Sequence, residues 1–225
     1  MKYEILGETL PVVVCELEEG ESLYSEAGAM SWMSPSMKMQ TTSKGGIGKA
    51  FGRMFSGESM FLNKYTALQS GKIAFASSMP GSIKKVDISP GNEKIIQKRA
   101  FLASTEDVEN SIYFNKNLKT GFFGGEGFIM QKLSGQGMAF IEIDGSVIEY
   151  DLAHGEELLV DNGYIAMMDA TCSFDVVTIS GAKNIFFGGE GLFLAKVTGP
   201  GKIMLQTMPI YELAGRILPY ISNKN

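Results

Sequence analysis

Three glutamates recur at nearly regular spacing, and they are the residues of this chain best placed for repeated chemistry. Glu126 and Glu190 lie 64 residues apart, each within the sequence Gly-Gly-Glu-Gly, and Glu58 lies 68 residues before Glu126 within Ser-Gly-Glu-Ser. Three carboxylates gathered around an axis would hold a hard divalent cation through oxygen ligands. Because glutamate between glycines is also a common turn device, a structural role in turns is the favoured interpretation and the cation site is the alternative.

A lysine follows each of these glutamates by six residues: Lys64, Lys132 and Lys196. On an extended strand an even separation places both side chains on one face, roughly 20 Å apart. The glutamate and lysine of one repeat are therefore too far apart to pair with each other. We expect each side chain to contact a neighbouring repeat, or the glutamates to accept hydrogen bonds from turn amides.

The spacing extends to glycine-rich segments and predicts three β units, 7–80, 81–144 and 145–208, with a tail at 209–225. Each unit is small and needs its neighbours to bury its apolar face, so we expect one domain over residues 1–225. A closed ring around an approximate three-fold axis is favoured over an in-line stack. Closure would leave no terminal sheet edge exposed.

The local pattern predicts an all-β protein, a β-sandwich or jelly-roll-like body with one or two short helices. Twenty-seven glycines separate short apolar runs, as in chains built of strands and turns. Strands are expected at 10–17, 138–143, 147–152 and 173–179. Asp144-Gly145 predicts a hairpin between the second and third of these, because a type I′ turn needs positive φ at both central residues.

Two segments are candidate helices, one in the tail over 209–218, ending before Pro219, and one over 46–55. The second places Ile47, Phe51 and Phe55 on one face, with Arg53 beside it. This segment is a candidate surface for a protein partner or an anionic membrane. The favoured interpretation is that its aromatic residues pack on the protein's own sheet.

The other reactive or aromatic side chains are expected to be structural. His154 precedes Gly155 and has no repeated histidine counterpart, which favours a turn residue over a general base. Cys15 and Cys172 lie in apolar runs and are expected to pack as buried thiols. The aromatic residues, Trp32 among them, lie mostly in apolar runs and are assigned to the core. No catalytic residue, metal or cofactor is predicted.

Composition limits the classes of partner. The net charge of -5 argues against a broad nucleic-acid-binding surface. No apolar run reaches the roughly 18 residues that span a bilayer, and residues 1–4 lack the pattern of a signal peptide. We expect a cytoplasmic protein.

The repeated motifs carry a resemblance to a known family. Phe55-Ser56-Gly57-Glu58-Ser59-Met60-Phe61, the two Phe-Gly-Gly-Glu-Gly copies and Ser78-Met79-Pro80-Gly81-Ser82-Ile83 resemble the altered-inheritance-of-mitochondria family of uncharacterised proteins. The resemblance covers nearly the whole chain. It implies three internal β repeats with a fold similar to the tryptophan RNA-binding attenuator protein, and no established enzymatic activity.

These observations favour a non-enzymatic scaffold or interaction protein that binds another protein and forms a homo-oligomer. A small-ligand or metal-binding protein is the alternative. RNA binding, by analogy with the attenuator fold, ranks third, and peripheral membrane contact through residues 46–55 ranks low.

Overall fold

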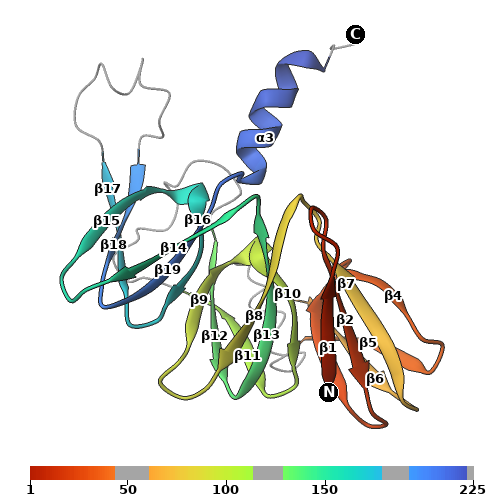
Figure 1. Ribbon diagram of the computed structural model, residues 1–225. Helices are drawn as coiled ribbons and strands as arrows, with labels where there is room; N and C mark the ends of the chain where they lie inside the picture. The colour runs from red at the N-terminus through yellow and green to blue at the C-terminus, as the bar shows by residue number, and fades with distance from the viewer. Residues whose placement is uncertain (44–60, 114–128, 179–192, 222–225) are drawn as a thin grey trace.

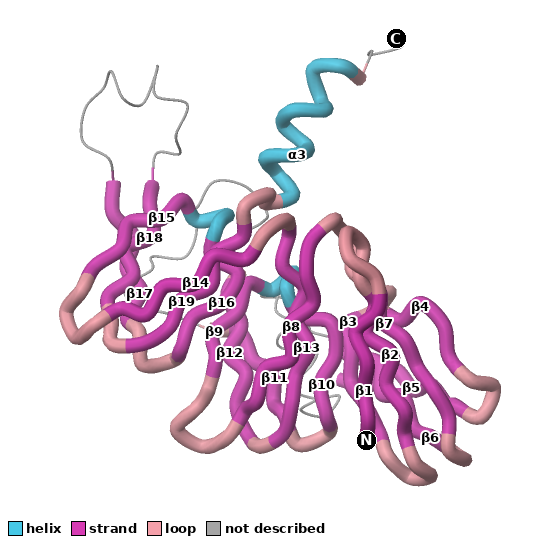
Figure 2. Tube along the Cα trace, in the orientation of Figure 1, coloured by secondary structure: helices cyan, strands magenta, loops and turns pink. Residues whose placement is uncertain are grey.

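The computed structural model describes residues 1–43, 61–113, 129–178 and 193–221, and antiparallel strands dominate these ranges. The strands form three blocks that lie side by side in Figure 1: β1–β7, β8–β13 and β14–β19, within residues 2–76, 81–144 and 147–206. The α-helix found in the described ranges, α3 (Ile210–Ile217), projects from the strands near the C-terminus (Figure 2). The predicted all-β class is confirmed.

The described strands pair into four antiparallel sheets. In order of pairing, the first sheet consists of β1 (Lys2–Leu6), β2 (Val12–Leu17), β7 (Gly71–Ala76) and β4 (Met30–Met33). The second sheet consists of β5 (Met37–Ser43), β6 (Phe61–Ala67), β3 (Ser22–Glu26), β10 (Phe101–Thr105), β13 (Gly137–Asp144) and β8 (Gly81–Ile88). The third sheet consists of β11 (Val108–Ile112), β12 (Met130–Gly135), β9 (Lys94–Gln97), β16 (Ile165–Asp169), β19 (Gly201–Gln206) and β14 (Val147–Leu152). The fourth sheet consists of β15 (Glu157–Asp161), β18 (Phe193–Thr198) and β17 (Ser173–Thr178).

The two six-stranded sheets each run through two blocks, and we call the strand pair where the blocks meet a joint. At the first joint β3 pairs with β10, and at the second joint β9 pairs with β16. The two joints are built in the same way: β5-β6-β3 followed by β10-β13-β8 at the first corresponds strand by strand to β11-β12-β9 followed by β16-β19-β14 at the second. Backbone hydrogen bonds therefore connect the blocks directly.

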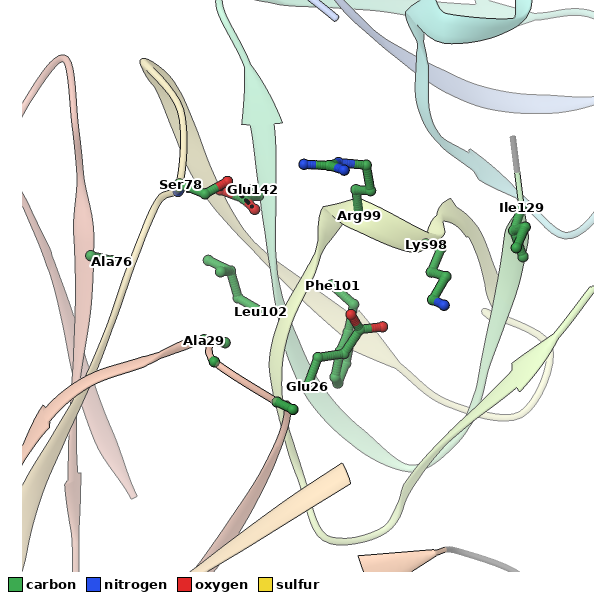
Figure 3. A pocket seen from close by; sticks show the side chains of 12 residues that line it. Glu26, Ala29, Ala76, Ser78, Lys98, Arg99, Phe101, Leu102, Ile129 and Glu142 are labelled. Carbon is green, nitrogen blue, oxygen red and sulfur yellow. Dashed lines mark hydrogen bonds between the residues drawn. The ribbon is translucent and has the colours of Figure 1, made fainter. Parts of the chain in front are cut away.

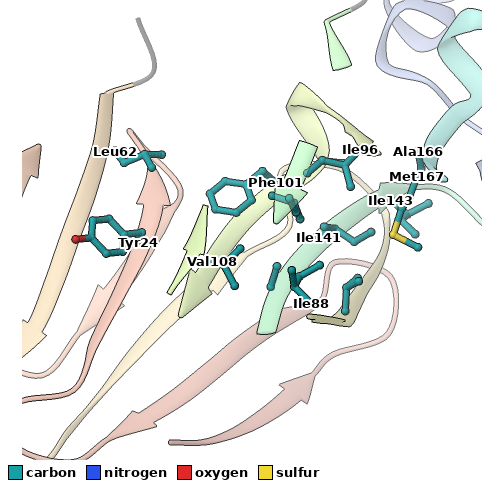
Figure 4. Packing of buried hydrophobic residues seen from close by; sticks show 14 residues of the cluster. Tyr24, Leu62, Ile88, Ile96, Phe101, Val108, Ile141, Ile143, Ala166 and Met167 are labelled. Atoms are coloured by element: carbon teal, nitrogen blue, oxygen red, sulfur yellow. The ribbon is translucent and has the colours of Figure 1, made fainter. Parts of the chain in front are cut away.

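Each block has its own hydrophobic core between two layers of strands. The second block's core gathers Ile141 of β13, Val108 of β11 and Leu133 of β12, together with Tyr24 from the first block and Met167 from the third (Figure 4). Side chains alternate along these strands, so a strand covered on both faces needs a continuous apolar run. The Ala139–Ile143 stretch of β13 meets this need, since four of its five residues are apolar and all five are buried.

The sheets form an open series, and this corrects the closed ring favoured from sequence. Within the described residues β4 ends the first sheet and β15 ends the fourth, and neither has a partner strand on its outer side. The strands that occupy the place of β4 in the second and third blocks are β10 and β16. The strands that occupy the place of β15 in the first and second blocks are β3 and β9. These four strands are all paired at the joints. One chain therefore leaves half of a joint open at each end.

The hairpin predicted at Asp144-Gly145 is wrong. Strand β13 pairs with β8 and β10, whereas β14 pairs with β19 in the next sheet. Gly145 does adopt a positive φ of 76°. The Gly145 amide donates a hydrogen bond to the Pro80 carbonyl oxygen at 2.7 Å. This turn carries the chain from the sheet that contains β13 to the sheet that contains β14. A local turn signal reports the backbone conformation but leaves the strand partners undetermined.

The tail helix is confirmed, since α3 ends at Ile217 and a 3₁₀ turn over Leu218–Tyr220 contains Pro219. The predicted strands at 10–17, 138–143, 147–152 and 173–179 correspond to β2, β13, β14 and β17, with small shifts at their ends. The candidate helix over 46–55 lies outside the described residues.

Replacing Phe140 by alanine should strongly destabilise the fold. Phe140 is fully buried, and its ring contacts the Tyr3 ring edge-on at a centroid distance of 5.1 Å. Removing a buried aromatic side chain leaves a cavity and typically costs about 3–5 kcal/mol. Urea unfolding should show this loss, whereas exposed Leu68→Ala should change the free energy of unfolding by no more than roughly 0.5 kcal/mol. Equal effects of the two substitutions would contradict the described packing.

Candidate functional site

The repeated glutamates and the aromatic segment proposed from sequence lie outside the described residues. This applies to Glu58, Glu126 and Glu190, and to Ile47, Phe51, Arg53 and Phe55. The three-carboxylate cation site therefore stays a prediction. Among the residues that the structure does describe, no three histidine, cysteine or acidic side chains come together in a group able to hold a metal ion.

The three repeated lysines occupy equivalent places on the middle strands β6, β12 and β18. Lys64 binds Glu106 of the second block at 2.5 Å, and its ammonium lies 5.7 Å from the centre of the Tyr24 ring. Lys196 binds Glu157 within its own block at 2.9 Å. These carboxylates raise the pKa of both lysines, chiefly through the hydrogen bond each accepts. Lys64 thus contacts a neighbouring block, whereas Lys196 does not.

The histidine and both cysteines have the structural roles expected of them. His154 lies exposed in the turn between β14 and β15. Cys15 and Cys172 are buried free thiols, and burial raises the pKa of Cys15 to about 12. A thiol held protonated in this way is a poor nucleophile at neutral pH.

A cleft of about 430 Å³ opens at the first joint, and sequence analysis did not find it. Its charged lining residues are Glu26, at the end of β3, Lys98 and Arg99, in the turn that precedes β10, and Glu142 of β13. Figure 3 shows Glu26 and Lys98 pointing into the same space, and Arg99 extending toward Glu142. The cleft therefore presents two carboxylates and two cations.

Burial raises the pKa of Glu26, the first of these carboxyls. The hydrogen bond from Gln131 Nε2 (3.2 Å) and the positive charges of Lys98 and Arg99 act in the opposite direction. Desolvation disfavours the ionised form of a carboxyl, and these neighbours partly compensate for it. Such a group is suited to receive a cationic ligand group.

The second carboxyl, Glu142, is held by two serines that precede β8. Its oxygens accept hydrogen bonds from the Ser78 amide at 2.7 Å, the Ser78 hydroxyl at 2.9 Å and the Ser77 hydroxyl at 2.9 Å. Charge-assisted hydrogen bonds of this kind fix a carboxylate in one position. The signal was present in the sequence, because Glu142 is the one charged residue in the apolar run Met138–Ile143.

The second joint has neutral, buried residues at the same places, and they bind each other directly. By strand register Gln97 is the counterpart of Glu26, and Gln206 is the counterpart of Glu142. Gln206 donates to Gln97 at 3.0 Å and to the Gly163 carbonyl at 2.8 Å, and Gln97 donates to the Tyr211 hydroxyl at 3.1 Å. Tyr211 of α3 thus joins the two glutamines in one hydrogen-bonded network at the second joint.

A second candidate site consists of the two open ends of the sheets. Trp32 of β4 is 53% exposed and Leu159 of β15 is 57% exposed. The exposure of Trp32 corrects its assignment to the core. β4 carries no charged residue or proline of the kind that usually protects an edge strand. Apolar side chains on an unprotected edge are typical of surfaces that bind protein.

Comparisons with known proteins give one family and no established activity. A family model described as mitochondrial biogenesis AIM24 matches residues 3–208. An uncharacterised protein of Streptococcus pyogenes serotype M6 is 29% identical over 225 residues, covering 95% of this chain and 89% of that protein. A crystal structure of a Streptococcus pyogenes protein superposes with a TM-score of 0.81 at 24% identity, covering 98% of this chain and 99% of that one. This structure shares the fold.

Asp144, next to the cleft, should make the fold less stable as the pH rises. Burial and the charge of Glu142 raise the pKa of Asp144 to about 6 from its ordinary 3.8. Between about pH 4 and pH 6 the folded protein keeps a proton that the unfolded chain releases, so this contribution to stability is lost as the pH rises. The substitution Asp144→Asn should therefore increase the urea midpoint relative to wild type at pH 7, but not at pH 4. Exposed Asp107→Asn is the control, and an equal difference at both pH values would contradict the prediction.

Removing the carboxyl of Glu142 should destabilise the first joint. Glu142→Ala leaves the Ser78 amide without its acceptor, which we expect to cost about 3 kcal/mol. Glu142→Gln keeps one acceptor oxygen and should cost roughly 1 kcal/mol. Urea unfolding of the two variants gives the comparison. If the alanine variant were as stable as wild type, the network would have no structural role.

Proposed function

This chain belongs to the mitochondrial biogenesis AIM24 family, and we propose that it acts as a non-enzymatic interaction protein that binds protein strands at its two open sheet ends. The observation that carries this proposal is the pair of exposed apolar side chains, Trp32 on β4 and Leu159 on β15. An edge strand adds a partner strand through backbone hydrogen bonds, and the apolar side chains beside it supply affinity.

The proposal treats the chain as three related β units, 7–80, 81–144 and 145–208, of the kind found in the tryptophan RNA-binding attenuator protein. The recurrence of one strand order across both joints supports this division. So do the register shifts at equivalent places in β4, β10 and β16. A series of repeated units binds partners through the surfaces that its two terminal units leave uncovered.

The protein works in the cytoplasm on this proposal. The two cysteines are free and buried, as is usual in a reducing compartment. Within the described ranges no helix is long and apolar enough to cross a bilayer.

Binding of a small zwitterionic molecule at the first joint is the second candidate function. The cleft brings Glu26 and Glu142 together with Lys98 and Arg99, and such a set can recognise an amine and a carboxylate in one molecule. At the second joint the equivalent residues, Gln97 and Gln206, are neutral and bind each other. A series of free amino acids tested by calorimetry would give heat that Glu26→Gln abolishes, and no heat from any of them would remove this candidate.

Photo-crosslinking in cells tests the interaction function at the two ends. A photoreactive amino acid replaces Trp32 or Leu159 in the full chain, and irradiation should link each position to a protein. The same residue at exposed Leu68 is the control for nonspecific reaction. Protein adducts at both end positions but not at Leu68 are the expected result. If neither end position gives an adduct, the interaction function is wrong.

A further inference from the structure

We propose that the two open sheet ends bind each other between copies, with β4 of one copy pairing antiparallel to β15 of the next. This inference rests on the proposed function and names its partner, a second copy of this chain. The chain contains both halves of a joint, one at each end, and they are too far apart in the series to meet within one molecule (Figure 1). A second copy supplies the missing half at each end.

The two joints inside the chain define the register of this pairing. At the first joint Ala103 lies opposite Ser25 and Ser104 lies opposite Tyr24. At the second joint Met167 lies opposite Ile96 and Met168 lies opposite Ile95. The two joints thus use equivalent residues in one register.

The counterparts at the open ends follow from pairing within each block. Trp32 lies opposite Ala74, directly after a register shift in β4. Ala103 and Met167 follow the same kind of shift in β10 and β16, and they lie opposite Phe140 and Met204. Leu159 lies opposite Lys196, as Tyr24 lies opposite Lys64 and Ile95 opposite Lys132. An intermolecular joint therefore places Trp32 opposite Val160 of the next copy, and Met33 opposite its Leu159.

The exposure of Trp32 is explained by the absence of its joint partner. Its counterparts Ala103 and Met167 are 0% and 3% exposed, and each packs into the core of the preceding block. In the first block no preceding block exists within the chain, and Trp32 is 53% exposed. In the proposed joint its indole packs against the third block of another copy.

Leu159 shows the reciprocal relation at the other end. Its counterparts Tyr24 and Ile95 are 8% and 1% exposed, and each packs into the core of the following block. Leu159 has no following block and is 57% exposed. Its neighbours Leu158 and Val160 already pack against the third core, so β15 is formed and Leu159 is its exposed apolar side chain.

Pairing between different ends accounts for both exposed residues, whereas pairing of like ends does not. Two β4 strands pairing with each other would cover Trp32 but leave Leu159 in water. A head-to-tail contact covers both, and it continues either into a closed ring or into an open filament. The hydrophobic effect favours the arrangement that removes more apolar surface from water.

The decisive experiment mixes two variants, each blocked at one end. In Trp32→Lys the β4 end is blocked and the β15 end is intact, and in Leu159→Lys the reverse holds. Sedimentation velocity should show each variant alone as a 24.4 kDa monomer. An equimolar mixture should form a dimer of twice this mass and nothing larger, because one intact β4 and one intact β15 remain. Wild type and the control Leu68→Lys should form larger oligomers.

Three results would overturn the proposal. A monomeric wild-type protein at the highest accessible concentration is the first. Self-association of Leu159→Lys alone is the second, because it indicates pairing of like ends. The third is a mixture that stays monomeric although circular dichroism shows both variants to be folded.

Cysteine crosslinking tests the register. Met33→Cys/Leu159→Cys should form intermolecular disulfides under mild oxidation, because directly opposite residues of an antiparallel pair have Cα atoms about 4.5–5.5 Å apart. Met33→Cys/Val160→Cys shifts the pair by one residue, turns one thiol to the other face and should not crosslink. The native Cys15 and Cys172 are buried and do not compete. Equal crosslinking of the two double variants would contradict the register.

Failure of self-assembly is distinguishable from failure of the interaction function. Photo-crosslinking at Trp32 and Leu159 that links copies of this chain supports both proposals. A monomeric wild-type protein whose two ends crosslink to a different protein overturns self-assembly and leaves the interaction function standing. A monomeric protein without adducts overturns both.

Discussion

The backbone pairing of strands across the two joints is the interaction on which the rest of this structure depends. β3 with β10, and β9 with β16, turn separate blocks into continuous sheets. Each joint strand then needs apolar residues on both faces, because one face packs on its own core and the other on the core of the neighbouring block. Phe101 and Leu102 of β10 show this division, since they belong to the second and the first core respectively. The joints thus fix both the order of the blocks and the composition of the strands.

The sequence predicted the features that depend on local pattern, and missed those that depend on which strands meet. The apolar run before Asp144 correctly indicated β13, and the lysines that recur in the sequence, Lys64, Lys132 and Lys196, lie on the middle strands β6, β12 and β18. The Asp144-Gly145 turn was assigned to a hairpin because local φ preferences are the same in a hairpin and in a crossing between sheets. Glu142 was missed as a site residue, since its partners Ser78 and Ser77 lie 64 and 65 residues earlier in the chain. Strand partners depend on tertiary packing, which no short window of sequence records.

The two joints share a backbone arrangement but differ in their polar chemistry. Glu26 and Glu142 at the first joint are replaced by Gln97 and Gln206 at the second, where the amides bind each other. Two amides can donate and accept mutually, whereas two carboxylates repel unless cations or other donors separate them. Lys98, Arg99 and the serines meet this need at the first joint, and a cleft remains between the charged groups. One backbone arrangement thus holds a charged cleft at the first joint and a directly hydrogen-bonded amide pair at the second.

The same reasoning explains why Trp32 was misassigned. Trp32 lies between methionines in the strand Met30–Met33, which favours a core position, and its counterparts Ala103 and Met167 are indeed buried. What differs at Trp32 is the absence of a preceding block, a property of its place in the series and not of its neighbours in sequence. Trp32 of β4 and Leu159 of β15 occupy the register positions that are buried in the joint strands inside the chain. Residues that meet the local criteria for the core but lie exposed at the two ends of such a series therefore support the proposal that a second copy binds there.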